Sequence, residues 1–505
     1  DDRDEAALHD ALTPLQSHRA AGRLRLALGG LRPEPLVAAD LIVLSPGVPP
    51  TRAPIAAARA AGVAITGEIE LASRFIAAPI VGITGTNGKS TVTSLCGAIA
   101  QACGRPSFCG GNLGTPLCTA IGTPAAAADG IVVVELSSYQ LETAETLSCT
   151  AATVLNLTPD HLDRYPSLAA YGDAKGRIFA NMQPLATRVW NADDPEVLAL
   201  CERRLGVGQP GYAFSLRGPV PPQYLMERSL RLGGWVEGAE LVLSGVAGGL
   251  RARVAGGEVP IERYPIAEMQ LVGQHNLANA LAALLLMRGA GLCSYEQARA
   301  ALRRFVALPH RMQLVAEAAG VRFYDDSKGT NVDAVVAGLE GFPRPLALIA
   351  GGRDKGGSYA PLRAVLQRSQ TRCVVVLGEA APLIQAALHG CDFPVVPAPA
   401  MEAAVQQAAA RCQPGDAVVL SPACSSFDMF RDYAHRAAVF TSAALALPGA
   451  RPAGVNEPPP EHGTRAEPSP PAGDVNEPPP EHGTRAESSS PAGGVSEPPQ
   501  QQERP

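Results

Sequence analysis

The segment "GITGTNGKST" combines glycines, one lysine and hydroxyl residues in an order that could hold a phosphate group. An apolar run before it predicts a strand, and "STVTSLCGAIAQA" predicts a following helix, which is the setting that a phosphate-binding loop requires. We therefore expect the backbone amides from Gly85 to Ser90 to converge on a phosphate at the amino end of this helix. Lys89 would pair with the β- and γ-phosphates of a nucleotide, and the Ser90 hydroxyl would ligate Mg²⁺. The alternative is a glycine-rich turn with an exposed lysine.

Polar residues after the next two apolar runs could complete such a site. Glu135 closes "IVVVE", where its carboxylate could ligate Mg²⁺ or act as a cap or ion-pair partner. The segment "LNLTPDHLDRYPSLAAYGDAKGRIF" then supplies His161, a metal ligand or a helix-start histidine, together with Asp160, Asp163 and Lys175. Taken singly, these residues favour structural roles. Because ligands bind beyond the carboxyl ends of parallel strands, we expect the strand ends to converge on one phosphate site.

Parallel sheets are needed to bring these positions together, and the chain has the corresponding pattern. Apolar runs that end in Gly, Ser, Asp or Asn alternate with helix-like stretches: "DLIVLSPG", "PIVGITG", "IVVVELSS", "ATVLNLTPD", "RVWNADD", "VRFYDDSKG", "PLALIAGG", "CVVVLGEA" and "DAVVLSPA". Such alternation predicts an α/β fold with sheets covered on both faces. Between residues 215 and 265, polar and apolar residues alternate around glycine turns, which predicts an antiparallel excursion.

The composition restricts the class of protein. The 505 residues are enough for several cores, and 46% hydrophobic with 18% charged residues is ordinary for a globular enzyme. A net charge of −6 argues against a nucleic-acid partner, which would need a basic surface. The 11 cysteines include no C-x-x-C pair, which favours reduced thiols in a cytoplasm over disulfides or structural zinc. We expect no membrane span, because no apolar run reaches roughly 18 residues, and no signal peptide.

The sequence changes character from Pro448 onward. "VNEPPPEHGTRAE" occurs at 455–467 and again at 475–487, and a degenerate copy starts at Val495. A solenoid repeat would need apolar residues to bury, and these copies have almost none. We therefore expect residues 448–505 to form a disordered, proline-rich tail, in which a metal role for the recurring His462 and His482 is the less favoured interpretation.

Several motifs, in order along the chain, resemble the ATP-dependent Mur ligases of peptidoglycan synthesis. They are "GITGTNGKST", "GGNLGTP", "VELSSYQLE", "LNLTPDHLDRY", "GQHNLANALAA", "LPHRM", "DDSKGTN", "GGRDKGG" and "LSPACSSFDMF". The resemblance runs from the first residues to about Leu447 and leaves the tail outside. The loop of that family is itself written G-T-N-G-K-[ST], so the absence of a glycine at Ile83 agrees with it. "ELSSYQLE" and "LSPACSSFDMF" point to the branch of the family that adds D-glutamate.

The resemblance implies a three-domain α/β ligase with a tail. Its parts would be a Rossmann-like UDP-substrate-binding domain at 1–76, a central P-loop-type ATP-binding domain at 77–307, a Rossmann-like D-glutamate-binding domain at 308–447 and the tail at 448–505. The implied reaction joins D-glutamate to UDP-N-acetylmuramoyl-L-alanine through an acyl phosphate, with ATP and two Mg²⁺ ions. The implied partners are small molecules, the location is the cytoplasm, and we expect a monomer.

The resemblance also implies site residues. Its nucleotide-binding positions correspond to Gly85, Thr86, Asn87, Gly88, Lys89, Ser90, Thr91, Asn276, Asn279, Arg311, Asp326 and Lys328. Its catalytic positions correspond to Lys89, Glu135, His161 and Lys175. Ser90 and Glu135 would hold one Mg²⁺, and His161 a second with Lys175 as a carbamate, since an ammonium cannot ligate a metal and a carbamate presents a carboxylate. Without the family, an exposed helix lysine would be the better interpretation of Lys175, and buried polar or cap residues that of the two asparagines.

The implied substrate-binding positions correspond to Arg3, Ser45, Pro46, Gly47, Asn112, Ser137, Thr330, Lys355, Ser426 and Tyr433. Among them Thr330, Lys355, Ser426 and Tyr433 would bind D-glutamate, since a lysine and hydroxyls suit a dicarboxylate. The family often has Phe at the last of these positions. Arg311, Asp326 and Lys328 follow the junction near Ala307, so closure of the domains is expected to complete the site.

Two features leave alternatives open. The family begins with an additional strand and glycine-rich turn that this chain, which starts at Asp1, lacks; Arg3 would then lie at the edge of a domain without its first βα unit. A folylpolyglutamate synthetase has a similar loop and also adds glutamate, but "SSYQLE" and "SPACSS" argue against it. A truncated, non-catalytic paralogue whose tail binds a partner is disfavoured by the intact loop and by Glu135, His161 and Lys175.

Overall fold

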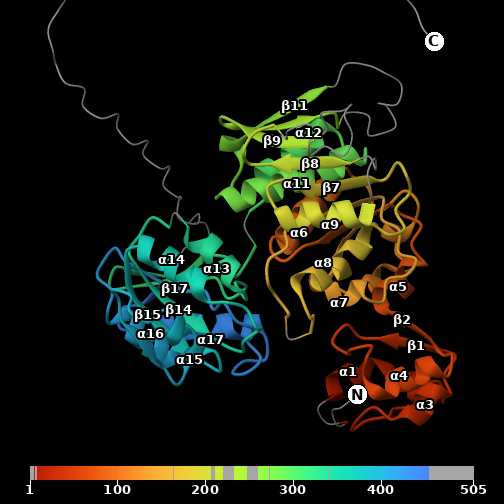
Figure 1. The fold of residues 1–505 in the computed structure, drawn as a ribbon, viewed down its shortest axis with the longest axis horizontal. Coiled ribbons are helices and arrows are strands. Elements are labelled where there is room, and N and C mark those ends of the chain that lie inside the picture. The colour runs from red at the N-terminus through yellow and green to blue at the C-terminus, as the bar shows by residue number, and fades with distance from the viewer. Residues whose placement is uncertain are drawn as a thin grey trace, which may run out of the picture. The chain divides into compact units, whose positions relative to one another are not determined.

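The computed structural model describes residues 5, 8–162, 164–205, 211–219, 233–246, 260–271, 273–306, 308–340 and 342–453. Within these residues the strands form sheets of two, nine and seven strands (Figure 1). Most neighbouring strands are parallel, so the predicted α/β class is confirmed. Arg3, Asp163, Ala307 and the tail with its two histidines lie outside the described residues.

The amino-terminal part contains one βαβ unit. Strand β1 (Leu41–Leu44) pairs in parallel with β2 (Ala64–Gly67), and α4 (Ala53–Ala60) connects them. Ile42 and Leu44 of β1 pack against Ile55 and Ala58 of α4 to form a small core. The other helices here are α1 (His9–Leu12), η2 (Thr13–Leu15), α2 (Gln16–Ala20), α3 (Pro33–Val37) and α5 (Glu68–Ser73).

The nine-stranded sheet has the order β11-β10-β9-β8-β7-β6-β3-β5-β4. Its strands are β3 (Ile80–Thr84), β4 (Ser107–Gly111), β5 (Ile131–Glu135), β6 (Ala151–Val154), β7 (Thr187–Asn191), β8 (Tyr212–Ser215), β9 (Gly233–Glu237), β10 (Glu240–Ser244) and β11 (Ile261–Pro265). Strands β4 to β9 and β3 are parallel, whereas β10 is antiparallel to both β9 and β11. The predicted antiparallel excursion is therefore confirmed for the described strands β9 to β11.

Both faces of this sheet are covered, which explains why its central strands β3 and β5 are largely apolar and buried. Val81 and Ile83 of β3 face a core that includes helices α6 (Lys89–Ala102), α11 (Gln274–Gly289) and α12 (Tyr295–Arg304). Ile80 faces the opposite core, built with α7 (Ser138–Leu141), α8 (Leu168–Gly176) and α9 (Pro195–Leu205). Because successive strand residues point to opposite faces, one continuous apolar run supplies both cores. The short 3₁₀ helices are η3 (Leu117–Ala120), η4 (Pro124–Ala126), η5 (Arg177–Phe179) and η7 (Ile266–Glu268).

The seven-stranded sheet has the order β16-β15-β14-β17-β13-β12-β18. Its strands are β12 (Gln313–Ala318), β13 (Val321–Asp325), β14 (Leu346–Gly351), β15 (Thr371–Leu377), β16 (Val395–Pro397), β17 (Ala417–Leu420) and β18 (Arg451–Pro452). Among these described strands, β12 runs opposite to the others and is antiparallel to both β13 and β18. One face packs on α13 (Val332–Leu339), α14 (Ala360–Arg368) and α15 (Ala381–Ala387), the other on α16 (Met401–Ala409) and α17 (Tyr433–Leu445).

Two further expectations concern the chain as a whole. All 11 cysteines lie among the described residues and are free, in agreement with reduced thiols. Within the same part of the chain, none of the helices is both long and apolar enough to cross a membrane.

Candidate active site

The phosphate loop joins β3 to α6, and its two outer glycines are required by sterics. Gly88 has φ 83° and is the N-cap of α6, and Gly85 has φ 147°. A Cβ at Gly88 would lie 2.3 Å from Asn279 Oδ1, and one at Gly85 would lie 2.9 Å from Leu155 Cβ. Because positive φ and close approach both favour glycine, the spacing that departs from the usual pattern is what this geometry demands.

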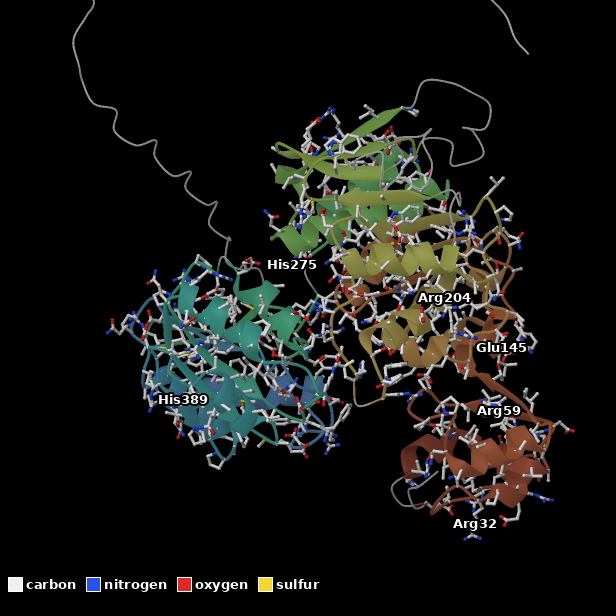
Figure 2. All side chains as sticks on the ribbon, viewed as in Figure 1. Arg32, Arg59, Glu145, Arg204, His275 and His389 are labelled. Atoms are coloured by element: carbon white, nitrogen blue, oxygen red, sulfur yellow. The ribbon has the colours of Figure 1, made fainter. Side chains whose placement is uncertain are left out.

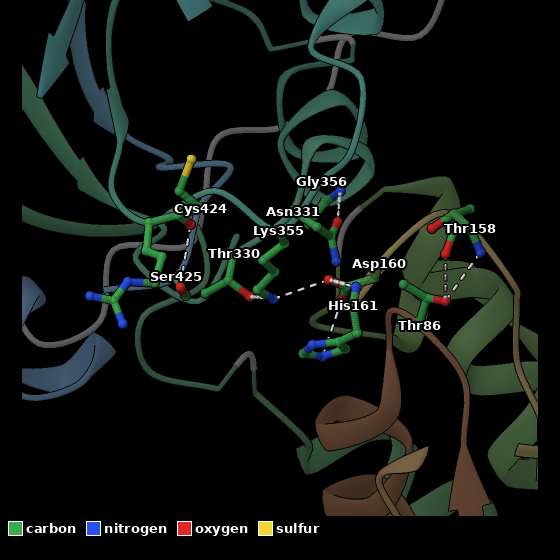
Figure 3. Close-up of polar contacts among 12 residues, drawn as sticks. Thr86, Thr158, Asp160, His161, Thr330, Asn331, Lys355, Gly356, Cys424 and Ser425 are labelled. Carbon is green, nitrogen blue, oxygen red and sulfur yellow. Dashed lines mark hydrogen bonds and ion pairs between the residues drawn. The ribbon is translucent and has the colours of Figure 1, made fainter. Parts of the chain in front are cut away.

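The loop is held by the segment that follows β6. The backbone amides of Thr86 and Asn87 donate to the backbone and side-chain oxygens of Asn156, at 3.0 and 2.7 Å. The Thr86 hydroxyl also accepts from the Thr158 amide at 3.1 Å (Figure 3). In this structure these two amides fix the loop to the neighbouring segment, and convergence of all amides from Gly85 to Ser90 on a phosphate stays a prediction. The amides in the first turn of α6, which have no partner within the helix, remain suited to an anion.

Two lysines point into the loop and donate to its backbone carbonyls. Lys89 Nζ donates to the carbonyls of Gly85 and Thr86, at 3.0 and 2.8 Å. Lys175, in the last turn of α8, is 1% exposed; its Nζ donates to the Gly85 carbonyl at 2.8 Å and lies 4.4 Å from the centre of the Tyr171 ring. Burial lowers the pKa of both amines, that of Lys175 well below its ordinary value. Lys175 is therefore not an exposed helix lysine.

Glu135 is a buried carboxylate with one unused oxygen. It ends β5, which pairs with β3 on one side and β4 on the other, so that it lies opposite Ile83 and Gly111. The side chain is 2% exposed, and Oε1 accepts from Asn112 Nδ2 at 2.7 Å. Oε2 is buried and has no hydrogen-bond partner among the described residues. A buried carboxylate oxygen without a partner is costly unless a ligand supplies one.

His161 and Asp160 lie beside the loop and contact residues from other elements. Lys355 Nζ is 3.2 Å from Asp160 Oδ1, which also accepts from the His161 amide at 3.0 Å (Figure 3). His161 has a left-handed backbone, φ 56°, and its Nδ1 is 2.9 Å from the Tyr139 hydroxyl.

Their charges follow from burial and from the neighbouring lysines. Burial lowers the pKa of His161 to about 4, against the opposing effect of Asp160, so the imidazole is neutral near pH 7 and keeps a lone pair for a metal. Burial alone would raise the pKa of Asp160, but Lys355 and His161 outweigh it and hold that pKa below its usual value. The site therefore combines a neutral imidazole with ionised carboxylate.

A cavity of about 280 Å³ lies next to the loop. Asn276 and Asn279 of α11 line it together with Arg311 and Asp326, as the sequence prediction grouped them. Asn279 Nδ2 donates to Asn276 Oδ1 at 3.3 Å, and His275, labelled in Figure 2, lines the same cavity near the start of α11. Burial raises the pKa of Asp326 to about 7, although its Oδ2 accepts from Ser421 Oγ at 2.6 Å.

The positions expected to bind D-glutamate lie on loops of the seven-stranded sheet. Lys355 Nζ is 3.5 Å from Thr330 Oγ1, so these two residues are brought together. Ser426 is buried in the loop after β17, and Tyr433 begins α17 with 36% of its surface exposed. Lys328 Nζ lies 5.3 Å from the centre of the Tyr433 ring, and burial lowers its pKa to about 8.

The described positions expected to bind the UDP-substrate lie just after strands β1, β4 and β5. Ser45, Pro46 and Gly47 directly follow β1, and the Ser137 hydroxyl forms a capping box with Gln140 at the start of α7. Asn112 is bonded to Glu135, as described above. Their contact with a substrate stays a prediction.

Asn331 is a functional candidate that the sequence interpretation did not single out. Its Nδ2 donates to Asn87 Oδ1 at 3.0 Å, and its Oδ1 caps α13 by accepting from the Ala334 amide at 2.9 Å. An asparagine before an apolar helix in "GTNVDAVV" signals the cap, but no sequence signal predicts the second bond to the phosphate loop.

Comparison with known proteins identifies the family of this chain. The family described as Mur ligase middle domain matches residues 83–287, the Mur ligase glutamate ligase domain matches 310–424, and the Mur ligase MurD-like N-terminal domain matches 1–67. The UDP-N-acetylmuramoylalanine--D-glutamate ligase of Syntrophotalea carbinolica is 44% identical over 84% of this chain and 88% of its own. The protein of the same name from Anaeromyxobacter dehalogenans is 44% identical over 87% of this chain and 90% of its own. This chain belongs to the Mur ligase family.

Solved Mur ligases share the fold. The UDP-N-acetylmuramate-alanine ligase of Thermotoga maritima has a TM-score of 0.51 at 18% identity, covering 80% of this chain and 84% of its own. A pseudomurein peptide ligase type C from Methanothermus fervidus has a TM-score of 0.51 at 17% identity, covering 81% of this chain and 89% of its own. As a Mur ligase, the chain is an enzyme of an ATP-dependent, Mg²⁺-using family.

Proposed function

We propose that this Mur ligase joins D-glutamate to UDP-N-acetylmuramoyl-L-alanine at the expense of ATP, as a cytoplasmic step in the synthesis of peptidoglycan precursors. The observation that carries the proposal is the near-complete coverage at 44% identity by relatives named for this reaction. The predicted domain boundaries at 76, 307 and 447 are part of the proposal, as is a monomeric state.

The residues around the loop fit a nucleotide and Mg²⁺. The orphaned Oε2 of Glu135 and the buried Ser90 hydroxyl are oxygen donors of the type that Mg²⁺ prefers. The absence of a Cβ at Gly85 and Gly88 lets the loop backbone lie directly against Leu155 and Asn279, where any side chain would clash. When bound there, Mg²⁺ would supply positive charge beside the phosphate oxygens and so favour phosphoryl transfer.

Lys89 would act on the transferring phosphoryl group. Its Nζ, now bonded to two loop carbonyls, would turn to the β- and γ-phosphates and offset negative charge as the substrate carboxylate attacks. The γ-phosphate would pass to the L-alanine carboxylate, giving an acyl phosphate and ADP. The amine of D-glutamate would then attack the acyl carbon, lose a proton and expel phosphate through a tetrahedral intermediate.

Lys175 is suited to carry the proposed carbamate. Because burial lowers its pKa well below the ordinary value, a neutral amine is available to attack carbon dioxide, forming a nitrogen–carbon bond and releasing a proton. The resulting carboxylate would offer, beside neutral His161, the oxygen donor that an amine lacks. This matters because, among the described residues, no cluster of three His, Cys, Asp or Glu gathers to hold a metal.

Lys355 would bind a carboxylate of D-glutamate together with Thr330, Ser426 and Tyr433. Its present partner is Asp160, so an incoming carboxylate would compete with an ion pair at 3.2 Å. This competition favours a substrate with two carboxylates, one for the lysine and one for neighbouring hydroxyls.

Phosphate release from ATP tests the proposal directly. With Mg²⁺ and bicarbonate, release should require both UDP-N-acetylmuramoyl-L-alanine and D-glutamate, and mass spectrometry should show the new amide. Reactions that lack one substrate, or that contain L-glutamate or a folate acceptor, are the controls. Absence of release with the complete mixture would refute the proposal, and release with the folate acceptor would favour a folylpolyglutamate synthetase.

A further inference from the structure

We propose that Asn112 is a positioning residue for Glu135: its side-chain amide occupies Oε1 of the carboxylate and thereby reserves Oε2 for Mg²⁺. This assigns Asn112 a role toward the metal in place of the substrate contact expected from its motif. The inference deepens the proposed function, since it rests on Mg²⁺ binding at Glu135.

Asn112 is bonded to Glu135 twice. Its Nδ2 donates to Oε1 at 2.7 Å, and its backbone amide donates to the Glu135 carbonyl at 2.9 Å. The backbone bond continues the pairing of β4 with β5, so the position of the Asn112 backbone relative to Glu135 is fixed. The amide and the carboxylate are therefore held face to face by the sheet itself.

The turn before Asn112 is shaped for this approach. Gly111 has φ 91°, and a Cβ there would lie 2.4 Å from the Glu135 carbonyl oxygen. The backbone amide of Gly111 donates to the Thr115 carbonyl at 2.7 Å, and this bond closes the turn "GGNLGT". A glycine at this position lets the turn lie against the last residue of β5, and Asn112 follows directly.

The consequence for Glu135 is an asymmetric carboxylate. Oε1 has a donor, whereas Oε2 is buried and has none among the described residues. Glu135 lies opposite Ile83, two residues before Gly85. The unused oxygen is thus in the part of the sheet where a phosphate-bound cation would lie. Ligating carboxylates are commonly fixed by such outer hydrogen bonds.

The test measures metal binding without turnover. Mn²⁺ binding to the full chain with ADP is followed by electron paramagnetic resonance for the wild type and Asn112→Ala. The variant should raise the Mn²⁺ dissociation constant by roughly 10- to 100-fold. Its affinity for ADP in EDTA and its KM for the UDP-substrate should stay within about twofold of the wild type. Glu135→Gln, which removes the ligand charge, gives the reference loss.

Asn181→Ala is the matched control. Asn181 Nδ2 donates to the carbonyls of Glu145 and Leu147, at 2.6 and 3.3 Å, so the variant also deletes an amide with backbone-anchoring bonds, but away from the loop. Its Mn²⁺ dissociation constant should not change. Thermal unfolding in EDTA monitors folding of each variant. If Asn112→Ala does not fold, Asn112→Gln serves, since it keeps the amide and displaces it by one methylene, and it should also weaken Mn²⁺ binding.

An unchanged Mn²⁺ dissociation constant in folded Asn112→Ala would overturn the inference, and an accompanying rise in KM for the UDP-substrate would return Asn112 to the substrate site. The two proposals fail separately. If the wild type binds Mn²⁺ and ADP but does not ligate D-glutamate, the proposed function is wrong and the role of Asn112 is still decided by the binding data.

Discussion

Glu70 and Lys175 are equally buried charged residues, at 1% exposure each, but their surroundings differ. Glu70, on α5, accepts from three successive backbone amides, those of residues 145–147, each at 3.0 Å. It also accepts from the Thr146 hydroxyl and from Arg74 at 3.0 Å. Lys175 donates to one carbonyl, and the nearby Glu135 leaves one oxygen unused.

This difference distinguishes a structural anchor, Glu70, from a binding site, the surroundings of the phosphate loop. A buried charge is costly unless hydrogen bonds and opposite charges compensate it, and the protein compensates Glu70 fully. Around the phosphate loop the compensation is incomplete, so a ligand can complete it. Burial of charge alone would have marked both regions as functional; the unused bonding capacity marks only one.

Among the variants, Lys89→Ala should show the largest loss of activity with no loss of stability. We expect phosphate release to fall by roughly 10³-fold, because the lysine offsets charge on the transferring group. Its melting temperature should not fall, since removing the half-buried ammonium also removes the cost of its desolvation, which offsets the loss of two bonds to carbonyls. The measurements are steady-state phosphate release and thermal unfolding.

Arg105→Ala is the control for this variant. Arg105 also donates to two backbone carbonyls, those of Asp129 and Gly130, but it precedes β4 and so lies at the opposite end of the parallel strands from the loop. It should lose a little stability and no activity. Equal loss of activity in the two variants would remove the distinction between the regions.

Lys175→Ala should have the next largest effect. We expect kcat to fall by roughly 10²-fold, because the carbamate would be lost as a metal ligand. Added formate or acetate should restore part of the activity, and Lys175→Arg, which keeps the charge, should not be restored. Steady-state kinetics with and without the added carboxylate measures this. Full activity of Lys175→Ala would contradict a carbamate.

Glu70→Gln should have the smallest effect on activity of these variants, and it should lower the stability of the fold. We expect unfolding to become easier by about 2 kcal/mol, as for other hydrogen bonds to a charged group, with kcat/KM almost unchanged. Burial alone would raise the pKa of Glu70, but bonds from Thr146 and Arg74 outweigh it and hold the pKa below its ordinary value. Its contribution to stability is thus present above the pKa of the unfolded chain, about 4.3, and is lost as the pH falls through the folded value.

The difference in melting temperature between the wild type and Glu70→Gln should therefore shrink below about pH 4. Glu145→Gln is the control: Glu145, labelled in Figure 2, is exposed in the same loop and contributes its backbone amide to the anchor. A pH-independent difference, or the same destabilisation in the control, would show that Glu70 is not the anchor.

The sequence predicts the elements well because their signals are local. Apolar runs with polar ends correspond to β1, β3, β5, β6, β7, β13, β14, β15 and β17, and the helix after the phosphate loop is α6. The same runs placed Glu135 and the loop at strand ends, where the structure has them. The proposed chemistry came from the resemblance to a family, since spacing alone left structural readings of His161 and Lys175 open.

The remaining features depend on contacts between distant segments. Nothing local in "LAAYGDAKG" shows that Lys175 is buried against Gly85, 90 residues away in the chain. The amides of Thr86 and Asn87 are used by Asn156, which only the pairing of β3 with β6 brings close. Asn331 has two roles, and the sequence signals only its cap.

The bonds from Lys89 to the carbonyls of Gly85 and Thr86 have a consequence for the thermodynamics of nucleotide binding. These two bonds already hold the loop backbone in place. An arriving phosphate therefore replaces the carbonyls as the partner of Lys89, and little additional backbone becomes ordered on binding. Calorimetry should then find a modest enthalpy for the loop contacts. A large negative heat-capacity change, if present, would report apolar surface buried elsewhere as the nucleotide binds.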